Sequence, residues 1–217
     1  GAEMTAGGYT RMQVPGLPGI FFRDQVLTLG ARRLRVYGAS AVDVLAARSI
    51  GRAPYWAVAW PAGLALARFL AGRDLSGRRV LEVGSGVGVS GLGAALAGAD
   101  VLVTDNVVPA LRVAAMNARR NDLPLRAAAA DWRAWPLRER FDMVVGSDVT
   151  YEPAAFDALL AVLRASLAPG GEVLLTEPRR SAMAAFLDRA RELGWDTGSS
   201  ELPPEGAQPV RIHRLRL

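Results

Sequence analysis

Short apolar runs alternate with amphipathic stretches along most of the chain. The apolar runs predict strands at about 79–84, 101–105, 125–130, 142–148 and 172–177, because buried parallel strands are nearly continuous in Val, Leu and Ala. The stretches between them carry apolar residues at helical spacing, as in Val89, Leu92 and Leu96. This alternation is typical of βαβ units, and it predicts an α/β fold with a parallel sheet.

Proline and glycine indicate where these elements begin and end. Pro109 and Pro153 stand where the first turn of a helix is expected, and Pro169-Gly170-Gly171 predicts a break before the strand at 172. Further helices are expected at 61–72 and 180–193. Segments 195–201 and 209–217 predict two last strands, the final one antiparallel, near a sheet edge and exposed on one face. The predicted fold is therefore Rossmann-like, with a seven-stranded, mostly parallel sheet, helices on both faces and an antiparallel last strand.

The first part of the chain does not follow this pattern. We predict an N-terminal extension over residues 1–50 and one larger domain over 51–217. Within the extension, 26–29 and 34–37 are apolar enough to pair as a hairpin around Gly30, as a lid or a brace. No early apolar stretch is long enough for a signal peptide or a membrane span, so no membrane partner is expected.

Composition narrows the possible chemistry. The 217 residues carry a net charge of +5, contain one histidine and no cysteine, and all 26 basic residues are arginine. Disulfides and zinc thiolate sites are excluded, no metal site is predicted, and a cytoplasmic location is expected. Basic clusters are interspersed with acidic residues instead of forming one stripe, so nucleic acid is not expected as a partner. The sequence assigns no oligomeric state.

A glycine-rich turn follows the first of the parallel strands. Glu82 lies within that strand, and Gly84, Gly86 and Gly88 follow it. Asp105 ends the next strand, 105 − 84 = 21 residues after the first glycine. Glycines let backbone amides approach a ligand, and a carboxylate at the end of the second strand accepts hydrogen bonds from ribose hydroxyls. The pattern therefore predicts a nucleoside cofactor.

The glycines can be aligned in two ways. Residues 86–91 also satisfy the dinucleotide pattern G-x-G-x-x-G, but Gly84 already stands directly after the strand, so the better register is Gly84, Gly86 and Gly88. With Glu82, this register resembles motif I of the seven-strand S-adenosylmethionine (SAM) methyltransferases. A dinucleotide site and a purely structural turn remain the alternatives.

An aromatic segment precedes the glycine turn. Tyr55, Trp56 and Trp60 lie within six residues and beside Pro61. Aromatic faces attract a cationic sulfur or ammonium by about 0.5 to 2 kcal/mol. Alternatively, the two tryptophans pack the following helix onto the sheet.

Several of these segments together resemble the family of protein-lysine methyltransferases that includes the enzymes acting on the electron-transfer flavoprotein beta subunit and on chaperones. The resemblance covers about residues 42–180. It rests on five segments: Tyr55-Trp56-Ala57, Trp60-Pro61-Ala62-Gly63, the pair Asn117 and Asn121, Asp131-Trp132, and a D-x-x-Y element at Asp148-Val149-Thr150-Tyr151. Glu177-Pro178-Arg179 and the first 40 residues depart from the family pattern, which leaves the substrate open.

The resemblance and the chemistry of these residues together assign roles. Glu82 is expected to hold loop amides or the amino group of SAM, Asp105 the ribose, and Asp131 and Trp132 the adenine. Asp148 and Tyr151 are the candidate catalytic pair, although helix capping and packing would also explain them. The cofactor set is Trp60, Glu82, Gly84, Ser85, Gly86, Gly88, Asp105, Asn106, Asp131, Trp132 and Ser147. The acceptor set is Tyr55, Trp56, Tyr151 and Glu177.

The predicted function is direct transfer of a methyl group from SAM to lysine of a protein substrate, with S-adenosylhomocysteine as the product. In-line transfer needs aligned reactants and no covalent intermediate. Two alternatives remain: methylation of a small amine or other small molecule, and a SAM-binding module without catalysis.

Overall fold

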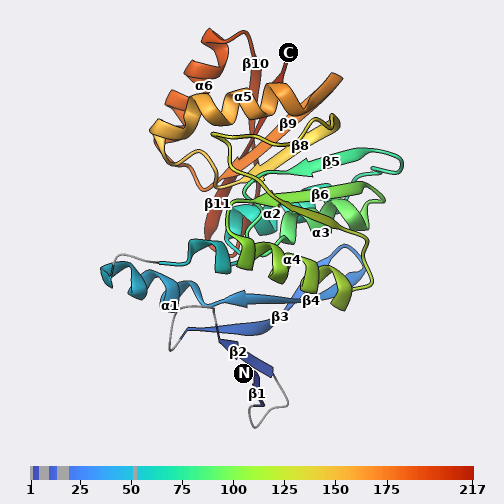
Figure 1. Cartoon of the computed structure of the whole chain (residues 1–217), viewed down its shortest axis with the longest axis vertical. Coiled ribbons are helices and arrows are strands. Elements are labelled where there is room, and N and C mark those ends of the chain that lie inside the picture. Colours follow the sequence, from blue (N-terminus) through green and yellow to red (C-terminus); the bar gives the residue numbers. More distant parts are fainter. Residues whose placement is uncertain (1, 5–9, 14–19, 51–52) are drawn as a thin grey trace.

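The computed structural model describes residues 2–4, 10–13, 20–50 and 53–217. It contains two sheets: a four-stranded sheet near the N-terminus and a seven-stranded sheet formed by the rest of the chain (Figure 1). The larger sheet has the order β10-β11-β9-β8-β5-β6-β7. Its strands are β5 (Arg79–Glu82), β6 (Asp100–Asp105), β7 (Arg126–Ala129), β8 (Phe141–Ser147), β9 (Leu167–Glu177), β10 (Asp196–Glu205) and β11 (Gln208–Arg216).

The direction of the strands confirms the predicted fold class. Strand β5 pairs in parallel with both β6 and β8, and the parallel arrangement continues to β7 on one side and β9 on the other. Strand β11 pairs antiparallel with β9 and β10. The strand order therefore reverses at β5, and the carboxyl ends of β5 and β8 diverge there. Such a point in an α/β sheet is where ligands bind.

Helices cover both faces of this sheet (Figure 1). One face carries α2 (Pro61–Ala71), α3 (Val89–Leu96) and α4 (Val108–Arg120), and the other carries α5 (Phe156–Ser166) and α6 (Ala182–Glu192). These helices were all expected from the sequence, although Pro153 opens a 3-10 turn, η3 (Pro153–Ala155), that leads into α5. Among the described residues, no helix combines the length and the apolar character needed to cross a membrane.

Strand β9 begins earlier than predicted. Leu167 already pairs with Phe141 of β8, and the register shifts before Glu172 pairs with Met143. The predicted break at 169–171 is therefore an irregularity inside β9, where Gly170 adopts a positive φ of 73°. Extra residues in one strand of a pair produce this kind of bulge.

The last strand also differs from its prediction. Strand β11 is antiparallel and next to the edge, as expected, but no single face of it is exposed. Val210 and Ile212 are buried on one face, whereas His213 and Leu215 are buried on the other. Ile212 packs with the cluster of α2 and α3, and Leu215 packs with that of α5 and α6. The buried side changes along the strand because each face is covered by helices over a different half of its length.

The N-terminal sheet has the order β1-β2-β3-β4. Its strands are β1 (Ala2–Met4), β2 (Thr10–Gln13), β3 (Phe21–Leu29) and β4 (Arg32–Ala39), followed by α1 (Ala41–Ala46), η1 (Ala47–Ile50) and η2 (Tyr55–Ala57). The predicted hairpin is present and longer than expected, with Gly30 at φ +58° in its turn. The parts of the prediction at residues 1, 5–9, 14–19 and 51–52 lie outside the described residues.

Two asparagines fasten β4 to the larger part of the molecule. Asn121 of α4 accepts the backbone N–H of Arg35 at 2.9 Å and donates to its C=O at 2.9 Å. Asn117, one helical turn earlier, makes the same pair of bonds with Tyr37 at 2.7 and 3.2 Å. The two side-chain amides thus satisfy the edge of β4 as a neighbouring strand would. Residues 20–39 also share a hydrophobic cluster with α3 and α4, so the extension is a brace against these helices.

The helices α2 and α3 touch through their backbones. A Cβ built on Gly93 of α3 would lie 2.3 Å from the carbonyl oxygen of Ala67 in α2. No side chain can be accommodated there without moving one helix, since both contacting groups are backbone.

We therefore predict that Gly93→Ala lowers the free energy of unfolding by about 1 to 3 kcal/mol or more, as overpacking does. Gly198→Ala is the matched control, because a Cβ there would meet nothing within 4 Å. Urea denaturation of both variants and the wild type measures the effect. Equal stability of the two variants would contradict the close helix contact.

Candidate active site

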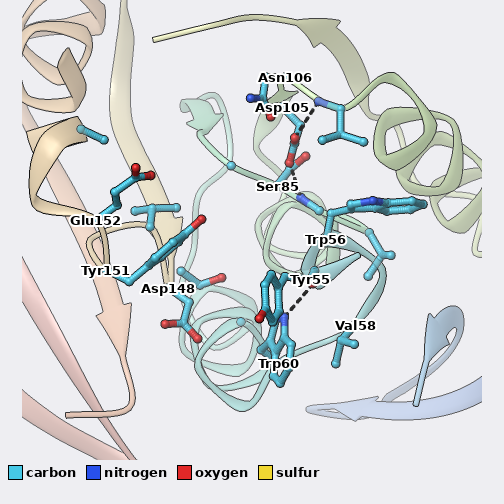
Figure 2. A pocket seen from close by; sticks show the side chains of 18 of the residues that line it. Tyr55, Trp56, Val58, Trp60, Ser85, Asp105, Asn106, Asp148, Tyr151 and Glu152 are labelled. Atoms are coloured by element: carbon cyan, nitrogen blue, oxygen red, sulfur yellow. Dashed lines mark hydrogen bonds between the residues drawn. The ribbon is translucent and has the colours of Figure 1, made fainter. Parts of the chain in front are cut away.

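A cavity of about 860 Å³ opens where the strand order reverses, at the carboxyl ends of β5, β6 and β8. This volume is typical of small-molecule sites. Figure 2 shows Tyr151, Asp148 and Glu152 on one side of it and Tyr55, Trp56 and Trp60 on the other. Of the residues predicted for the site, those that line the cavity are Tyr55, Trp56, Trp60, Gly84, Ser85, Gly86, Asp105, Asn106, Asp131, Trp132, Ser147, Asp148 and Tyr151.

The glycine turn has the predicted register. Gly84, Gly86 and Gly88 adopt positive φ values of 60°, 53° and 87°, a region that favours glycine. Gly91, which the dinucleotide pattern would require, lies instead inside α3. The turn also runs tightly under the aromatic segment, because a Cβ on Gly86 would lie 2.8 Å from the carbonyl oxygen of Trp56.

Asp105 stands at the end of β6 with its carboxylate turned toward the glycine turn (Figure 2). Its two oxygens accept the backbone N–H groups of Gly86 and Val107, each at 2.9 Å. Burial raises the pKa of the Asp105 carboxyl, and these backbone donors oppose the rise. Because each carboxylate oxygen has two lone pairs, each keeps one acceptor position for a ligand hydroxyl.

Asp131 and Trp132 border the cavity just after β7. Asp131 accepts the backbone N–H of Arg133 at 2.8 Å, so its carboxylate orders a turn and does not cap a helix. Trp132 is half-buried, packs against the core beside α5 and lies against Gly84. Both residues therefore have structural contacts in addition to their position at the cavity.

The aromatic segment is ordered by its own contacts. The indole N–H of Trp60 donates to the carbonyl of Tyr55 at 2.8 Å, and their ring centroids lie 6.4 Å apart (Figure 2). Trp56 packs at 5.9 Å against Phe22 of β3. The segment thus combines the two roles considered from the sequence: it lines the cavity, and it packs the N-terminal sheet against the larger sheet.

Asp148 and Tyr151 form the opposite wall. Asp148 has a positive φ of 56° and donates its backbone N–H to Thr176 of β9 at 2.8 Å. Its carboxylate accepts the Nε–H of Arg180 at 2.7 Å. Burial and the carboxylates of Glu152 and Asp148 raise the pKa of the Tyr151 phenol, so Tyr151 is a neutral hydrogen-bond donor at ordinary pH.

Three predicted site residues do not line the cavity: Glu82, Gly88 and Glu177. Glu177 was expected beside the acceptor but is 1 % exposed and accepts the Nε2–H of His213 at 3.0 Å. The sequence assigned it to the site because it follows β9, yet its side chain points into the sheet side occupied by β11.

Glu82 lies beneath the cavity. It is 1 % exposed, and its Oε1 accepts the backbone N–H of Gly91 at 2.9 Å in the first turn of α3. Burial raises the pKa of Glu82 to about 8. Its position supports α3 and the end of the glycine turn, and the cavity lining offers no support for a contact with a ligand amino group.

Arg180 is the main residue of the site that the sequence did not indicate. It follows β9 by three residues, and β9 is the neighbour of β8, which carries Asp148. The rule that the carboxyl ends of adjacent parallel strands gather at one edge would have pointed to it. Among the described residues, no group of three or more candidate ligands could hold a metal ion.

The buried carboxyl predicts a dependence of stability on pH. Since the folded protein holds the Glu82 proton up to about pH 8 and the unfolded chain releases it near 4.5, stability falls as pH rises through this window. Glu82→Gln keeps an acceptor for Gly91 and cannot ionise. We expect the variant to gain stability relative to wild type from about pH 5 to about pH 8, by at most about 1.4 kcal/mol per pH unit. Urea denaturation across this range measures it, and a difference independent of pH would contradict the assignment.

Comparisons with known proteins place the chain among methyltransferases. The solved structure of the glycopeptide N-methyltransferase MtfA complexed with SAM has a TM-score of 0.62 at 16% identity, covering 82% of this chain and 98% of that one. A TehB-like SAM-dependent methyltransferase from Corynebacterium glutamicum has a TM-score of 0.58 at 19% identity, with 81% and 94% covered. At these identities, the likeness shows the fold.

Curated relatives are more similar in sequence. The electron transfer flavoprotein beta subunit lysine methyltransferase of Danio rerio is 33% identical, over 59% of this chain and 51% of the relative. The protein N-lysine methyltransferase METTL21A of Danio rerio is 36% identical, over 57% and 60%. The histone-arginine methyltransferase METTL23 of Homo sapiens is 30% identical, over 67% and 82%. The chain thus spans little more than half the length of the first two relatives.

A family model described as lysine methyltransferase matches residues 45–192. That range takes in the aromatic segment, the glycine turn, Asp105 and the Asp148–Tyr151 wall, which together form the cavity. Since the match covers more than half of the 217 residues, the chain belongs to the lysine methyltransferase family.

Proposed function

We propose that this protein is a SAM-dependent methyltransferase that methylates lysine side chains of a protein substrate. One observation carries the proposal: a single cavity joins a glycine turn and ribose-type carboxylate on one side to a wall of Asp148, Tyr151 and aromatic rings on the other. Membership of the lysine methyltransferase family supports it. A cytoplasmic location, expected from the cysteine-free composition, is part of the proposal.

The cavity fits SAM on its own geometry. The missing Cβ atoms of Gly84 and Gly86 let backbone pass close to a ligand, and Asp105 keeps acceptor positions for the two ribose hydroxyls. Asn106, Asp131 and Trp132 follow β6 and β7, where we place the adenine. Tyr55 and Trp60 offer ring faces to a cationic sulfur.

Bound SAM would supply a methyl carbon whose bond to sulfur breaks as the lone pair of the acceptor nitrogen bonds to it, leaving neutral S-adenosylhomocysteine and a methylated ammonium. The chain's own residues align the acceptor and exclude water. A lysine amine with a pKa near 10.4 costs roughly 4 kcal/mol to deprotonate at neutral pH. The rings of Tyr55, Trp60 and Tyr151 favour the neutral amine by desolvation.

Arginine is the second candidate acceptor, since METTL23 is a histone-arginine methyltransferase by name and is covered over 82% of its length. A guanidinium stays charged and is bound best by paired carboxylates with both of its edges. Asp148 already pairs with Arg180, which leaves less negative charge to hold a second guanidinium. This arrangement favours lysine. A small amine and a non-catalytic SAM-binding role are tested by the same experiments.

The cofactor assignment predicts selective stabilisation. SAM and S-adenosylhomocysteine should raise the melting temperature, whereas NAD and NADP should not. Asp105→Ala should weaken SAM binding by about 1 to 3 kcal/mol, measured by calorimetry, because charged hydrogen bonds to the ribose are lost. Stabilisation by NAD without SAM would overturn the assignment.

The acceptor assignment predicts methyl-lysine on another protein. The chain has no lysine, so lysine-linked label from radioactive SAM cannot arise on its own side chains. Lysate proteins labelled by the enzyme should yield methyl-lysine after hydrolysis, and Tyr151→Phe should reduce turnover at saturating SAM. Methyl-arginine would assign the second candidate. Label confined to small molecules would refute a protein acceptor, and SAM binding without transfer would indicate a non-catalytic module.

A further inference from the structure

Arg180 lies at the point where the acceptor would approach. It lines the cavity together with Asp148, Tyr151 and Glu152. Its Nε donates to Asp148 at 2.7 Å, and the Asp148 side chain is only 14% exposed. The pair therefore occupies the wall of the cavity instead of the outer surface.

The turn that carries Arg180 is held from below. The backbone N–H of Arg180 donates to Glu177, whose other oxygen accepts from His213. Burial lowers the pKa of His213 despite the opposing effect of Glu177, so the ring is neutral at ordinary pH. With its Nε2–H directed to Glu177, its Nδ1 accepts from Ser199 at 2.7 Å. This buried chain of hydrogen bonds fixes the backbone of Arg180 relative to β9 and β11.

The pairing changes what Asp148 can do for an amine. An unpaired carboxylate attracts an ammonium and stabilises its charged form, which lacks the lone pair needed for methyl transfer. With Arg180 bound, the pair carries no net charge. Asp148 Oδ1 is used by Arg180, whereas Oδ2 can accept a hydrogen bond from either form of the amine.

We propose that Arg180 is a positioning residue that neutralises Asp148, so that the cavity selects the acceptor amine in its uncharged, nucleophilic form. This inference rests on the proposed function and deepens it. Asp148 then orients the amine by a hydrogen bond, and the guanidinium removes the preference of the carboxylate for a cation.

Other charged or titratable groups face the same space. Glu152 and Tyr151 come from the segment after β8, Asp105 from β6, and Glu177 from β9. The remaining ones in the lining are Arg48, Asp131 and Arg133. A comparison of single variants leaves all of these unchanged.

Arg180→Gln tests the proposal, with Arg179→Gln as the matched control. Both remove one positive charge, but Arg179 pairs with Glu201 and does not line the cavity. At saturating acceptor and SAM, the pH dependence of kcat reports ionisation in the bound complex. For Arg180→Gln, we expect the acidic limb of kcat to move to higher pH by about one unit, hence about tenfold lower kcat at pH 7. The acceptor KM should fall at the same time, and activity should recover at high pH.

A loss of kcat that is equal at every pH, or a raised KM, would show that Arg180 serves only to hold the wall together and would overturn the proposal. An Arg179→Gln profile that shifts equally would assign the effect to overall charge and would overturn it as well.

A binding measurement separates this proposal from the assignment of function. The probe is n-butylamine, a lysine side chain without its backbone, titrated by NMR into protein loaded with S-adenosylhomocysteine. At pH 7, Arg180→Gln should bind it on the order of tenfold more tightly than wild type, because the unpaired carboxylate attracts the ammonium. The gap should close toward pH 10. A gap that is absent or the same at all pH values would refute the role of Arg180. Absence of any methylated lysine, with this pattern intact, would refute only the acceptor assignment.

Discussion

The packing around the glycine turn is the constraint on which the rest of the structure depends. A Cβ on Gly84, Gly86 or Gly88 would lie 2.8 Å from a neighbour in each case, and each neighbour comes from a different segment. These neighbours are Val149 after β8, Trp56 of the aromatic segment and Ala114 of α4. The turn is therefore the place where both walls of the cavity and a helix meet. Any side chain there would push the walls apart.

The N-terminal sheet depends on the same turn. Asn117, which is fully buried, donates to the carbonyl of Val87 at 3.0 Å in addition to its bonds with Tyr37 of β4. Trp56 connects from above, since it touches Phe22 of β3 as well as Gly86. The extension is thus joined to the cofactor side of the cavity by one amide and one indole. Its sheet braces the aromatic wall instead of standing apart as a separate unit.

The sequence was informative wherever a local pattern determines structure. Parallel strands that are buried on both faces are recognised by continuous apolar runs, and glycines at positive φ have few substitutes, so β5, β6, β8 and the turn at 84–88 could be predicted. Features that depend on distant partners could not. The side chain of Glu177 pairs with His213, 36 residues away, and β11 changes its buried face because two different helix layers cover it. The contact of Arg180 with Asp148 depends likewise on the adjacency of β8 and β9.

The identity of residue 180 matters for the chemistry as much as its position. Arginine keeps its charge throughout the accessible pH range, so its effect on Asp148 does not vary with pH. A lysine in its place would bring a titratable amine into the acceptor side of the cavity, and a desolvated lysine loses its proton readily. Such an amine would itself be a nucleophile beside the proposed methyl donor. Because the chain contains no lysine, no side-chain amine of its own competes with the acceptor, and the charges of the cavity are carried by groups that cannot be consumed in lysine methylation.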